Sequence, residues 1–283
     1  MQLSPRYDLA PVIVIDGPVD GQLAPASRQR RRLAALLSSL SDEQLRAASR
    51  CDGWTVTDVA AHLVGVNAFW HGSVAAGIAG TPTRVLAGFD PARTPGLMVD
   101  AMRSLAPAEV VEHLVATNEP FLDAISNLDQ QGWAALAESP AGHVPIHLVV
   151  QHALWDCWVH ERDILLPLGA TQSIEPDEIV SCLRYAAAVS AAFAITAGTA
   201  IPATLGVEAS DPGGRFWLEV GDCVDVHEGT PPSGSPCLRG EAIDLIEALS
   251  MRGPMPASVP PEWQNLLLGG LATVFDQAGS SAE

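Results

Sequence analysis

Residues 152–163 hold a dense group of side chains that could bind a cation. His152, Asp156 and His160 recur every four residues among apolar and aromatic neighbours. Side chains four residues apart lie on one face of an α-helix, one turn above the next. Imidazole nitrogens and carboxylate oxygens are ligands of zinc and of several other divalent metals. The spacing therefore predicts a helix that points several metal ligands in roughly the same direction.

A further candidate ligand, His62, lies far upstream in an apolar segment that follows a helix-start signal at Thr55 to Asp58. Three protein ligands with one open position are the pattern of a catalytic metal site. We predict that His62, Asp156 and His160 bind a divalent metal, most simply zinc, between two facing helices. His152 is predicted as a catalytic residue, and a role as ligand, second-layer partner or proton donor stays open.

Structural roles would explain parts of this pattern. His62 alone could be a core histidine bonded to a carbonyl, and Asp156 with His160 could be a helix-stabilising pair worth roughly 0.2–0.5 kcal/mol. An aspartate between Trp155 and Trp158 is costly to bury without a partner, however. The combination therefore favours a metal, and the two tryptophans are expected to pack.

Neighbouring charged and thiol residues are expected to be structural. Cys157 faces about 100° away from Asp156 on a helix, so packing rather than catalysis is predicted for it. The run Glu161-Arg162-Asp163 is expected to be solvated. The basic cluster Arg28 to Arg32 is expected on the exposed side of a first helix.

Composition narrows the class of protein. At 283 residues the chain favours two domains, and its 48% hydrophobic and 17% charged content makes burial easy. All 15 basic residues are arginine, which excludes a lysine Schiff base and a Walker-type phosphate loop. The net charge of −18 argues against nucleic acid as a partner.

Membrane and secretion signals are not expected. No run reaches 18 uninterrupted apolar residues, and the first residues lack the pattern of a signal peptide. Five scattered cysteines without a C-x-x-C pair suit free thiols in a reducing cytoplasm. We expect small-molecule partners, no membrane contact, and a monomer or homodimer.

The chain is divided into an N-terminal arm (1–24), a four-helix bundle (25–170) and a C-terminal α+β domain (171–283). The bundle helices are predicted at about 25–39, 55–78, 95–128 with a break at Pro107, and 145–166, with a short turn at 41–45 and a loop at 129–143. Four such helices form a bundle, and bundles place metal sites on their facing inner surfaces.

After residue 170 the pattern changes from long helices to a mixture of helices and short strands. Helices are predicted at 175–197, 241–251 and 262–276, and strands at 201–208, 215–220, 223–227 and 236–239. Asp211 to Gly214 is predicted to form a hairpin turn. Val12 to Ile15 is either a short strand or an extended arm.

Two motifs carry a family resemblance. Trp54-Thr-Val-Thr-Asp58-Val-Ala-Ala-His62-Leu, followed by Asp156-x₃-His160-x₂-Asp163, resembles the mycothiol-dependent maleylpyruvate isomerase family of the DinB-like metalloenzymes. The resemblance covers residues 25–275 and implies a mainly α fold, with a DinB-like four-helix bundle and a smaller α+β domain. It implies a metal held by two histidines, matched by His62 and His160, and a glutamate, where this chain has Asp156.

The resemblance also implies a chemistry. The open metal position would take the sulfur of a low-molecular-weight thiol, such as mycothiol, and the thiolate would attack a small electrophile. An arginine of the C-terminal domain would contact thiol or substrate; Arg252 is predicted, with Arg239 as the rival. We predict an S-transferase or thiol-exchange enzyme. A maleylpyruvate-type cis/trans isomerase, a metal-dependent hydrolase and a non-enzymatic binding or regulatory bundle stay open as alternatives.

Overall fold

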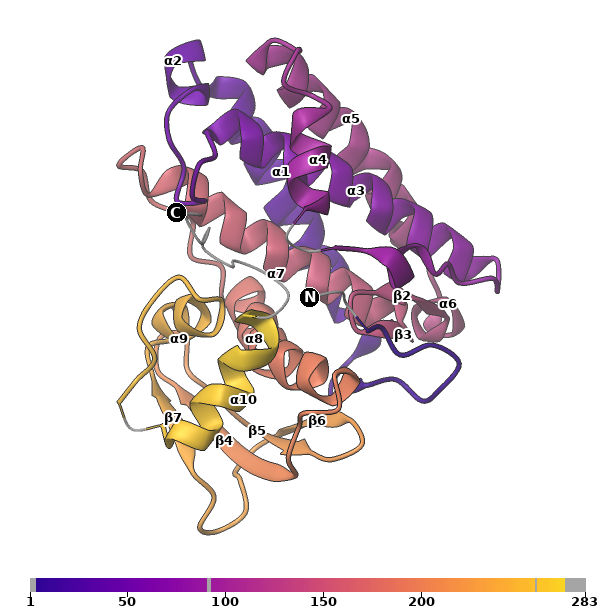
Figure 1. Cartoon of the computed structure of the whole chain (residues 1–283), viewed down its shortest axis with the longest axis vertical. Coiled ribbons are helices and arrows are strands. Elements are labelled where there is room, and N and C mark those ends of the chain that lie inside the picture. The colour runs from indigo at the N-terminus through magenta and orange to yellow at the C-terminus, as the bar shows by residue number, and fades with distance from the viewer. Residues whose placement is uncertain (1–3, 91–92, 258, 273–283) are drawn as a thin grey trace.

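Four long helices form the N-terminal half of the molecule (Figure 1). The computed structural model describes residues 4–90, 93–257 and 259–272. The bundle helices are α1 (Leu23–Ser39), α3 (Val56–Ile78), α5 (Pro107–Ser126) and α7 (Ile146–Leu165). The short helices α2 (Asp42–Leu45) and α4 (Thr94–Asp100) and the 3-10 turn η2 (Val85–Gly88) lie between them, and the 3-10 turn η1 (Val19–Gln22) precedes α1. The mainly α fold predicted from the sequence is confirmed.

Local signals set where the bundle helices begin. Thr55 Oγ1 accepts a hydrogen bond from the backbone N–H of Asp58 at 3.1 Å, and the Asp58 carboxylate accepts one from the N–H of Thr55 at 2.9 Å. This reciprocal cap satisfies two otherwise unpaired donors at the start of α3. Helix α5 begins at Pro107, which lies in its first turn. The helix break predicted at Pro107 is therefore confirmed.

Helix α7 is the bundle helix that lies next to the C-terminal domain (Figure 1). Pro145 is its N-cap residue, one position earlier than the first-turn site predicted for it. Helix α7 is packed against α1 and α3 of the bundle and also against α8 of the C-terminal domain. Most residues of α7 are therefore buried. Charged side chains on α7 therefore need partners from other elements.

The segment predicted as a loop at 129–143 is ordered, and that prediction is wrong. It holds α6 (Gln130–Ala134) and an antiparallel hairpin of β2 (Leu136–Ser139) and β3 (Gly142–Pro145). The backbone of Arg6 joins this hairpin, with its N–H on Ala141 O at 3.0 Å and its carbonyl accepting from His143 at 3.1 Å. Gly142 has φ +119°, and a Cβ there would lie 2.1 Å from Arg6 O. The hairpin depends on this distant partner, which local patterns do not reveal.

Glu138 on β2 fixes three segments to one another. Its side chain is fully buried and accepts four hydrogen bonds. Tyr7 Oη at 2.6 Å and Leu86 N at 2.8 Å donate to Oε1, while Thr83 Oγ1 at 2.6 Å and Val85 N at 2.9 Å donate to Oε2. Four donors offset the cost of taking this carboxylate out of water. It holds the N-terminal segment and η2 against the hairpin.

Glu138→Gln is expected to lower the free energy of unfolding by about 3 kcal/mol. The amide NH₂ of glutamine would replace one carboxylate oxygen, and the two donors that bond this oxygen would then face another donor. Urea unfolding followed by circular dichroism measures the change. The control is Glu119→Gln, whose side chain is 53% exposed and should move stability by less than about 0.5 kcal/mol. Equal effects of the two substitutions would contradict the anchoring role.

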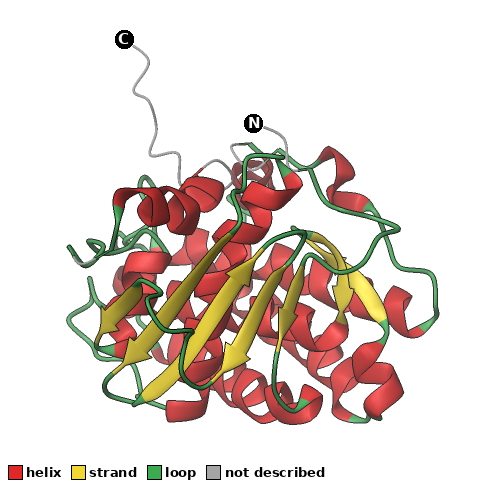
Figure 2. Ribbon diagram, turned by 90° about the horizontal axis from the view of Figure 1, so that it is seen from below, coloured by secondary structure: helices red, strands yellow, loops and turns green. Residues whose placement is uncertain are grey.

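The C-terminal domain is a mixed sheet with its helices on one face (Figure 2). Its elements are α8 (Pro176–Thr196), β4 (Ala203–Ala209), β5 (Gly214–Val220), β6 (Val224–Glu228), β7 (Cys237–Gly240), α9 (Ala242–Leu249) and α10 (Pro261–Ala272). The strand order is β1-β6-β5-β4-β7. The α+β domain predicted from the sequence is confirmed, and the part of the last helix expected beyond 272 lies outside the described residues.

The N-terminal arm contributes to this sheet. Strand β1 (Ile13–Ile15) pairs in parallel with β6, Ile13 opposite Val224 and Ile15 opposite Val226. Of the two alternatives for this segment, the strand is correct. The arm is therefore part of the C-terminal sheet in space, although the bundle follows it in sequence.

Helix α8 is the one helix of the described segments long and apolar enough to span a membrane by composition. It is 78% buried over that window and packs between α7 and the helices α9 and α10. The apolar character of α8 is therefore explained by its position in the core, between the bundle and the rest of the C-terminal domain.

Candidate metal centre

The structure brings His62, Asp156 and His160 together. One ligand atom of each lies within 4.8 Å of the other two. His160 Nε2 is 3.6 Å from Asp156 Oδ1, and the two imidazole rings are 5.0 Å apart at an angle of 73°. His62 comes from α3, and the other two residues come from adjacent turns of α7. Two nitrogens and one carboxylate at this spacing fit a tetrahedral divalent metal with one position left for a further ligand.

An unsatisfied oxygen supports this fit. Asp156 Oδ2 is buried and accepts no hydrogen bond among the described residues. A buried carboxylate oxygen without a donor is costly, and such groups are rare unless a ligand or ion satisfies them. The residues present therefore suit the divalent metal that the donor set implies.

His160 is oriented by a second carboxylate. Its Nδ1 lies 3.1 Å from Asp163 Oδ2, which is one turn further along α7. When Nδ1 carries the proton and donates it to Asp163, the Nε2 lone pair points toward Asp156. Metal-binding histidines commonly use such a partner to fix the tautomer and the ring orientation.

Asp163 is in turn held by two guanidinium groups. Arg252 Nε lies 3.0 Å from Oδ1 and Arg252 Nη2 lies 3.1 Å from Oδ2, while Arg50 Nε is 3.4 Å from Oδ1. Burial alone would raise the pKa of the Asp163 carboxyl, but the hydrogen bond from His160 and the charge of Arg252 lower it well below its usual range. Asp163 therefore stays ionised, and its solvated placement in the sequence prediction is wrong.

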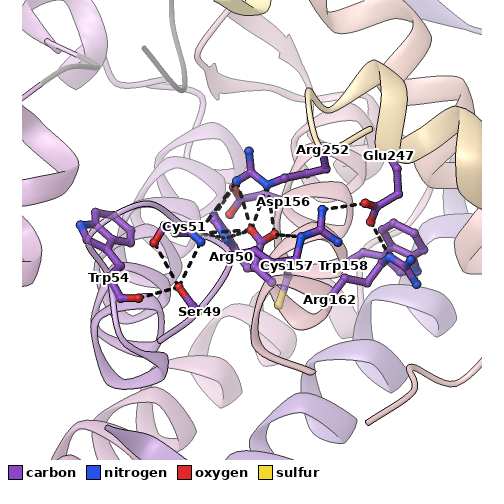
Figure 3. A network of polar contacts seen from close by, with 12 residues as sticks. Ser49, Arg50, Cys51, Trp54, Asp156, Cys157, Trp158, Arg162, Glu247 and Arg252 are labelled. Atoms are coloured by element: carbon purple, nitrogen blue, oxygen red, sulfur yellow. Dashed lines mark hydrogen bonds and ion pairs between the residues drawn. The ribbon is translucent and has the colours of Figure 1, made fainter. Parts of the chain in front are cut away.

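The C-terminal domain reaches the centre through the end of α9. Met251 adopts a left-handed backbone with φ +60°, and Arg252 follows it toward Asp163. Glu247 pairs with Arg50 at 2.6 Å and with Arg162 at 2.5 Å, as Figure 3 shows. Both domains therefore build the surroundings of His160.

Two other charged residues predicted to be solvated, Glu161 and Arg30, are also buried, whereas Arg31 is 62% exposed as predicted. Glu161 is 1% exposed and pairs with Arg32, which also pairs with the buried Glu178 of α8. Arg30 is 1% exposed, donates to Asn67 and Ala153 O, and lies over a phenylalanine ring. The predicted exposed placement is therefore wrong for Glu161 and Arg30, because their partners come from distant segments.

Cys51 is a site residue that the sequence did not single out. Its Sγ lies 3.3 Å from Asp163 Oδ2, 3.7 Å from His160 Nδ1 and 3.9 Å from Arg252 Nη2. Cys51, His160 and Asp163 form a second group with ligand spacing. Arg252 already supplies a cation there, since its Nη2 contacts both the sulfur and Oδ2. Only the spatial approach of the turn at 50–54 reveals this residue.

His152 lies away from the metal group. It is 2% exposed, its Nδ1 is 2.6 Å from Tyr185 Oη, and it packs against Trp70 and Trp155. Burial lowers the pKa of His152 to about 4, so its imidazolium form is not populated near neutral pH. His152 therefore lies in the core, and it does not belong to either group of residues with metal-ligand spacing among the described residues.

The two predicted arginines are placed differently. Arg252 touches Asp163 and Cys51 at the centre, whereas Arg239 on β7 pairs with Glu208 at 2.9 Å and is 62% exposed. The structure therefore groups only Arg252 with the candidate ligands. Cys157, in contrast, is 3% exposed within the core, and burial raises the pKa of its thiol to about 11, as expected of a packing residue.

Metal binding is expected to release a proton from His160. Burial alone would lower the pKa of His160, but its bond to Asp163, its contact with Cys51 and the charge of Asp156 raise it well above its ordinary value. A metal needs the Nε2 lone pair, so the proton must leave. Affinity should rise by up to about tenfold per pH unit below that pKa. Titration calorimetry in two buffers of different ionisation enthalpy measures the release, and an affinity independent of pH would contradict it.

The helical bundle followed by a mixed sheet defines a mainly α protein, with a His-Asp-His group of ligand spacing between two of its bundle helices. Residues 26–165 match the family described as the mycothiol maleylpyruvate isomerase N-terminal domain. The N-terminal part of the chain therefore carries the domain of this family.

Two solved structures share the fold over most of this chain. One is described as the crystal structure of the mycothiol-dependent maleylpyruvate isomerase; its TM-score is 0.61 at 17% identity, over 87% of this chain and 96% of that one. The other is a histidine-to-alanine mutant of that isomerase, with the same TM-score and coverage at 16% identity. No curated protein matches the sequence at a significant level.

Proposed function

We propose that this protein is a metal-dependent enzyme that uses a low-molecular-weight thiol, most simply mycothiol, as a nucleophile on a small electrophilic substrate. The observation that carries the proposal is the convergence of His62, Asp156 and His160 from α3 and α7 within the family's domain. Zinc is the metal that best suits two imidazoles and one carboxylate. The five free cysteines suit a reducing compartment, and we place the enzyme in the cytoplasm.

The three ligands would hold the metal, which when bound supplies the charge that keeps a thiol deprotonated near neutral pH. The chain's own contribution is orientation. Asp163 accepts the hydrogen bond of His160 Nδ1 and so presents Nε2 to the centre. Arg252 and Arg50 keep Asp163 ionised and in place. The guanidinium of Arg252 also puts positive charge beside the centre, which favours anionic thiols and substrates.

The aspartate at position 156 favours a reaction other than that of the solved isomerases. Aspartate is one methylene shorter than the glutamate that the resemblance implies, so its carboxylate lies closer to α7. A displaced centre changes the space for the substrate. This difference supports transfer or exchange of the thiol, with cis/trans isomerisation of a maleylpyruvate-type substrate as the alternative.

Assays of the zinc-loaded protein with mycothiol and a panel of electrophiles that includes maleylpyruvate test the proposal. Transfer consumes one thiol per product and leaves a stable thioether, whereas isomerisation needs the thiol but does not consume it. Mass spectrometry of the products separates these two outcomes. Turnover without any thiol would identify a hydrolase. No turnover together with no stoichiometric metal would favour a non-enzymatic bundle and would overturn the proposal.

A further inference from the structure

Arg30 on α1 is a buried positive charge that the proposed function does not use. Its side chain lies within the bundle, and the residue is 1% exposed. The other arginines of the same run each pair with a carboxylate: Arg28 with Glu178, Arg31 with Glu119 and Arg32 with Glu161. Among the described residues, no carboxylate lies within ion-pair distance of Arg30.

The partners of Arg30 are neutral and come from the other three helices of the bundle. Its Nη1 donates to Oδ1 of Asn67 on α3 and, at 3.5 Å, to Oδ1 of Asn118 on α5. Its Nη2 donates to the carbonyl of Ala153 on α7 at 3.2 Å. The guanidinium carbon lies 4.7 Å from the centre of the Phe121 ring, and the buried Nε–H has no acceptor among the described residues.

The guanidinium of Arg30 keeps its charge in this setting. Burial lowers the pKa of Arg30, but the ordinary pKa of arginine is so high that the group stays protonated near neutral pH. A full charge without a counter-charge is costly to bury, so the charge itself calls for an explanation.

Arg30 lies close to the candidate metal centre along the bundle. Asn67 follows the ligand His62 by five residues of α3, which is about 7.5 Å of helix. Ala153 precedes the ligand Asp156 by three residues of α7, which is about 4.5 Å of helix. Among the described carboxylates, Asp156 is the one whose charge acts on Arg30. The positive charge is therefore placed beside the centre without being one of its ligands.

We propose that Arg30 raises the affinity of the metal centre for an anionic ligand at its open position. The inference rests on the proposed function, which places a metal there and brings a thiol to it as the anion. A divalent metal held by two imidazoles and one carboxylate keeps about one unit of positive charge. Arg30 adds a second positive charge in an interior of low dielectric, and so favours an anion over a neutral ligand.

Coulomb's law gives the size of the effect. At a separation of roughly 8 Å and an effective dielectric constant of about 20, two unit charges change an equilibrium constant by a factor of roughly 30. Water that reaches the open position screens part of this interaction, so we expect an effect of about tenfold. A neutral ligand has no net charge on which Arg30 can act.

The test uses the full chain loaded with cobalt(II), which binds nitrogen and oxygen ligands as zinc does and changes its absorption spectrum when a further ligand enters. The probes are thiocyanate, which is an anion, and imidazole, which is mainly neutral at about pH 8. Arg30→Gln is expected to lower the affinity for thiocyanate about tenfold and that for imidazole by less than about twofold. The ratio of the two affinities cancels a general change in the shape of the site.

Two further variants make the test specific. Arg30→Met serves if Arg30→Gln folds poorly, because apolar side chains often replace buried ions without loss of stability. Asn118→Ala is the matched control, since it removes a neutral partner of Arg30 and should keep the ratio of affinities within about twofold of the parent value.

The outcomes separate this inference from the proposed function. If Arg30→Gln and Arg30→Met change both affinities equally, or change neither, then Arg30 is a structural residue and the inference is overturned while the metal centre stands. A parent chain that binds no cobalt would overturn the metal centre and this inference together. None of these measurements needs turnover.

Discussion

His62→Ala and His160→Ala are each expected to lose the bound metal on purification. Each substitution removes one of the three ligand atoms that lie within 4.8 Å of one another. Removal of an outer-layer partner already costs about 10–100-fold in affinity, so loss of a ligand should cost at least about 100-fold. Elemental analysis of purified protein, followed by zinc titration against a competing chelator, measures both occupancy and affinity.

Two other histidines provide matched controls. His113→Ala removes an exposed imidazole on α5 and should leave metal content unchanged. His152→Ala removes the buried imidazole that bonds Tyr185, so it should lower stability but retain the metal. Full metal retention in both His62→Ala and His160→Ala would defeat the assignment. Metal loss in His152→Ala, with the fold intact, would restore His152 as a ligand.

The spacing of residues along α7 correctly predicted that Asp156 and His160 lie together, but it wrongly added His152 to them. Period-four placement correctly set Asp156 and His160 on one face of α7. The same rule also included His152, which lies eight residues before His160. Over eight residues a helix rises about 12 Å and rotates about 80° beyond two full turns. A single ion cannot be reached by both ends of such a ladder. His152 therefore falls beside Tyr185 in the core.

The missed residues depend on long-range partners. Asp163 reads as solvated in a Glu-Arg-Asp run, because nothing local shows that Arg252, from the other domain, will pair with it. Glu161 likewise depends on Arg32 of α1. Cys51 joins the centre only through a turn closed by Trp54. Sequence periodicity gives the face of a helix, whereas these contacts require the packing of elements far apart in the chain.

The bundle was more predictable than the segments between its helices. Its helices carry their own start signals, such as the cap at Thr55 and the proline at position 107. The hairpin at 136–145 has only two short strands and is completed by the backbone of Arg6. Strand β1 is equally short and finds its place only beside β6. Short strands need partners that local propensity cannot identify.

Asp156 and Asp163 of α7 should respond differently to the same substitution when no metal is bound. Asp163→Asn is expected to lower the free energy of unfolding by about 3 kcal/mol, because it removes the buried carboxylate that pairs with Arg252 and Arg50. The pKa of Asp163 is lowered in the folded state, so its contribution is complete above about pH 4 and is lost as the pH falls below that.

Asp156→Asn is expected to change the stability of the metal-free protein by less than about 0.5 kcal/mol. Among the described residues, Asp156 pairs with His160 at 3.6 Å, and its buried Oδ2 accepts no hydrogen bond. The zinc affinity of Asp156→Asn should nevertheless fall at least about 100-fold, because a neutral amide oxygen replaces an anionic ligand. Urea unfolding with chelator and zinc titration measure the two quantities on both variants. A residue that serves only packing loses stability when altered, whereas a ligand loses the metal. Equal losses of stability in Asp156→Asn and Asp163→Asn, with zinc affinity intact in the former, would therefore make Asp156 a structural carboxylate and leave the proposed thiol chemistry without its centre.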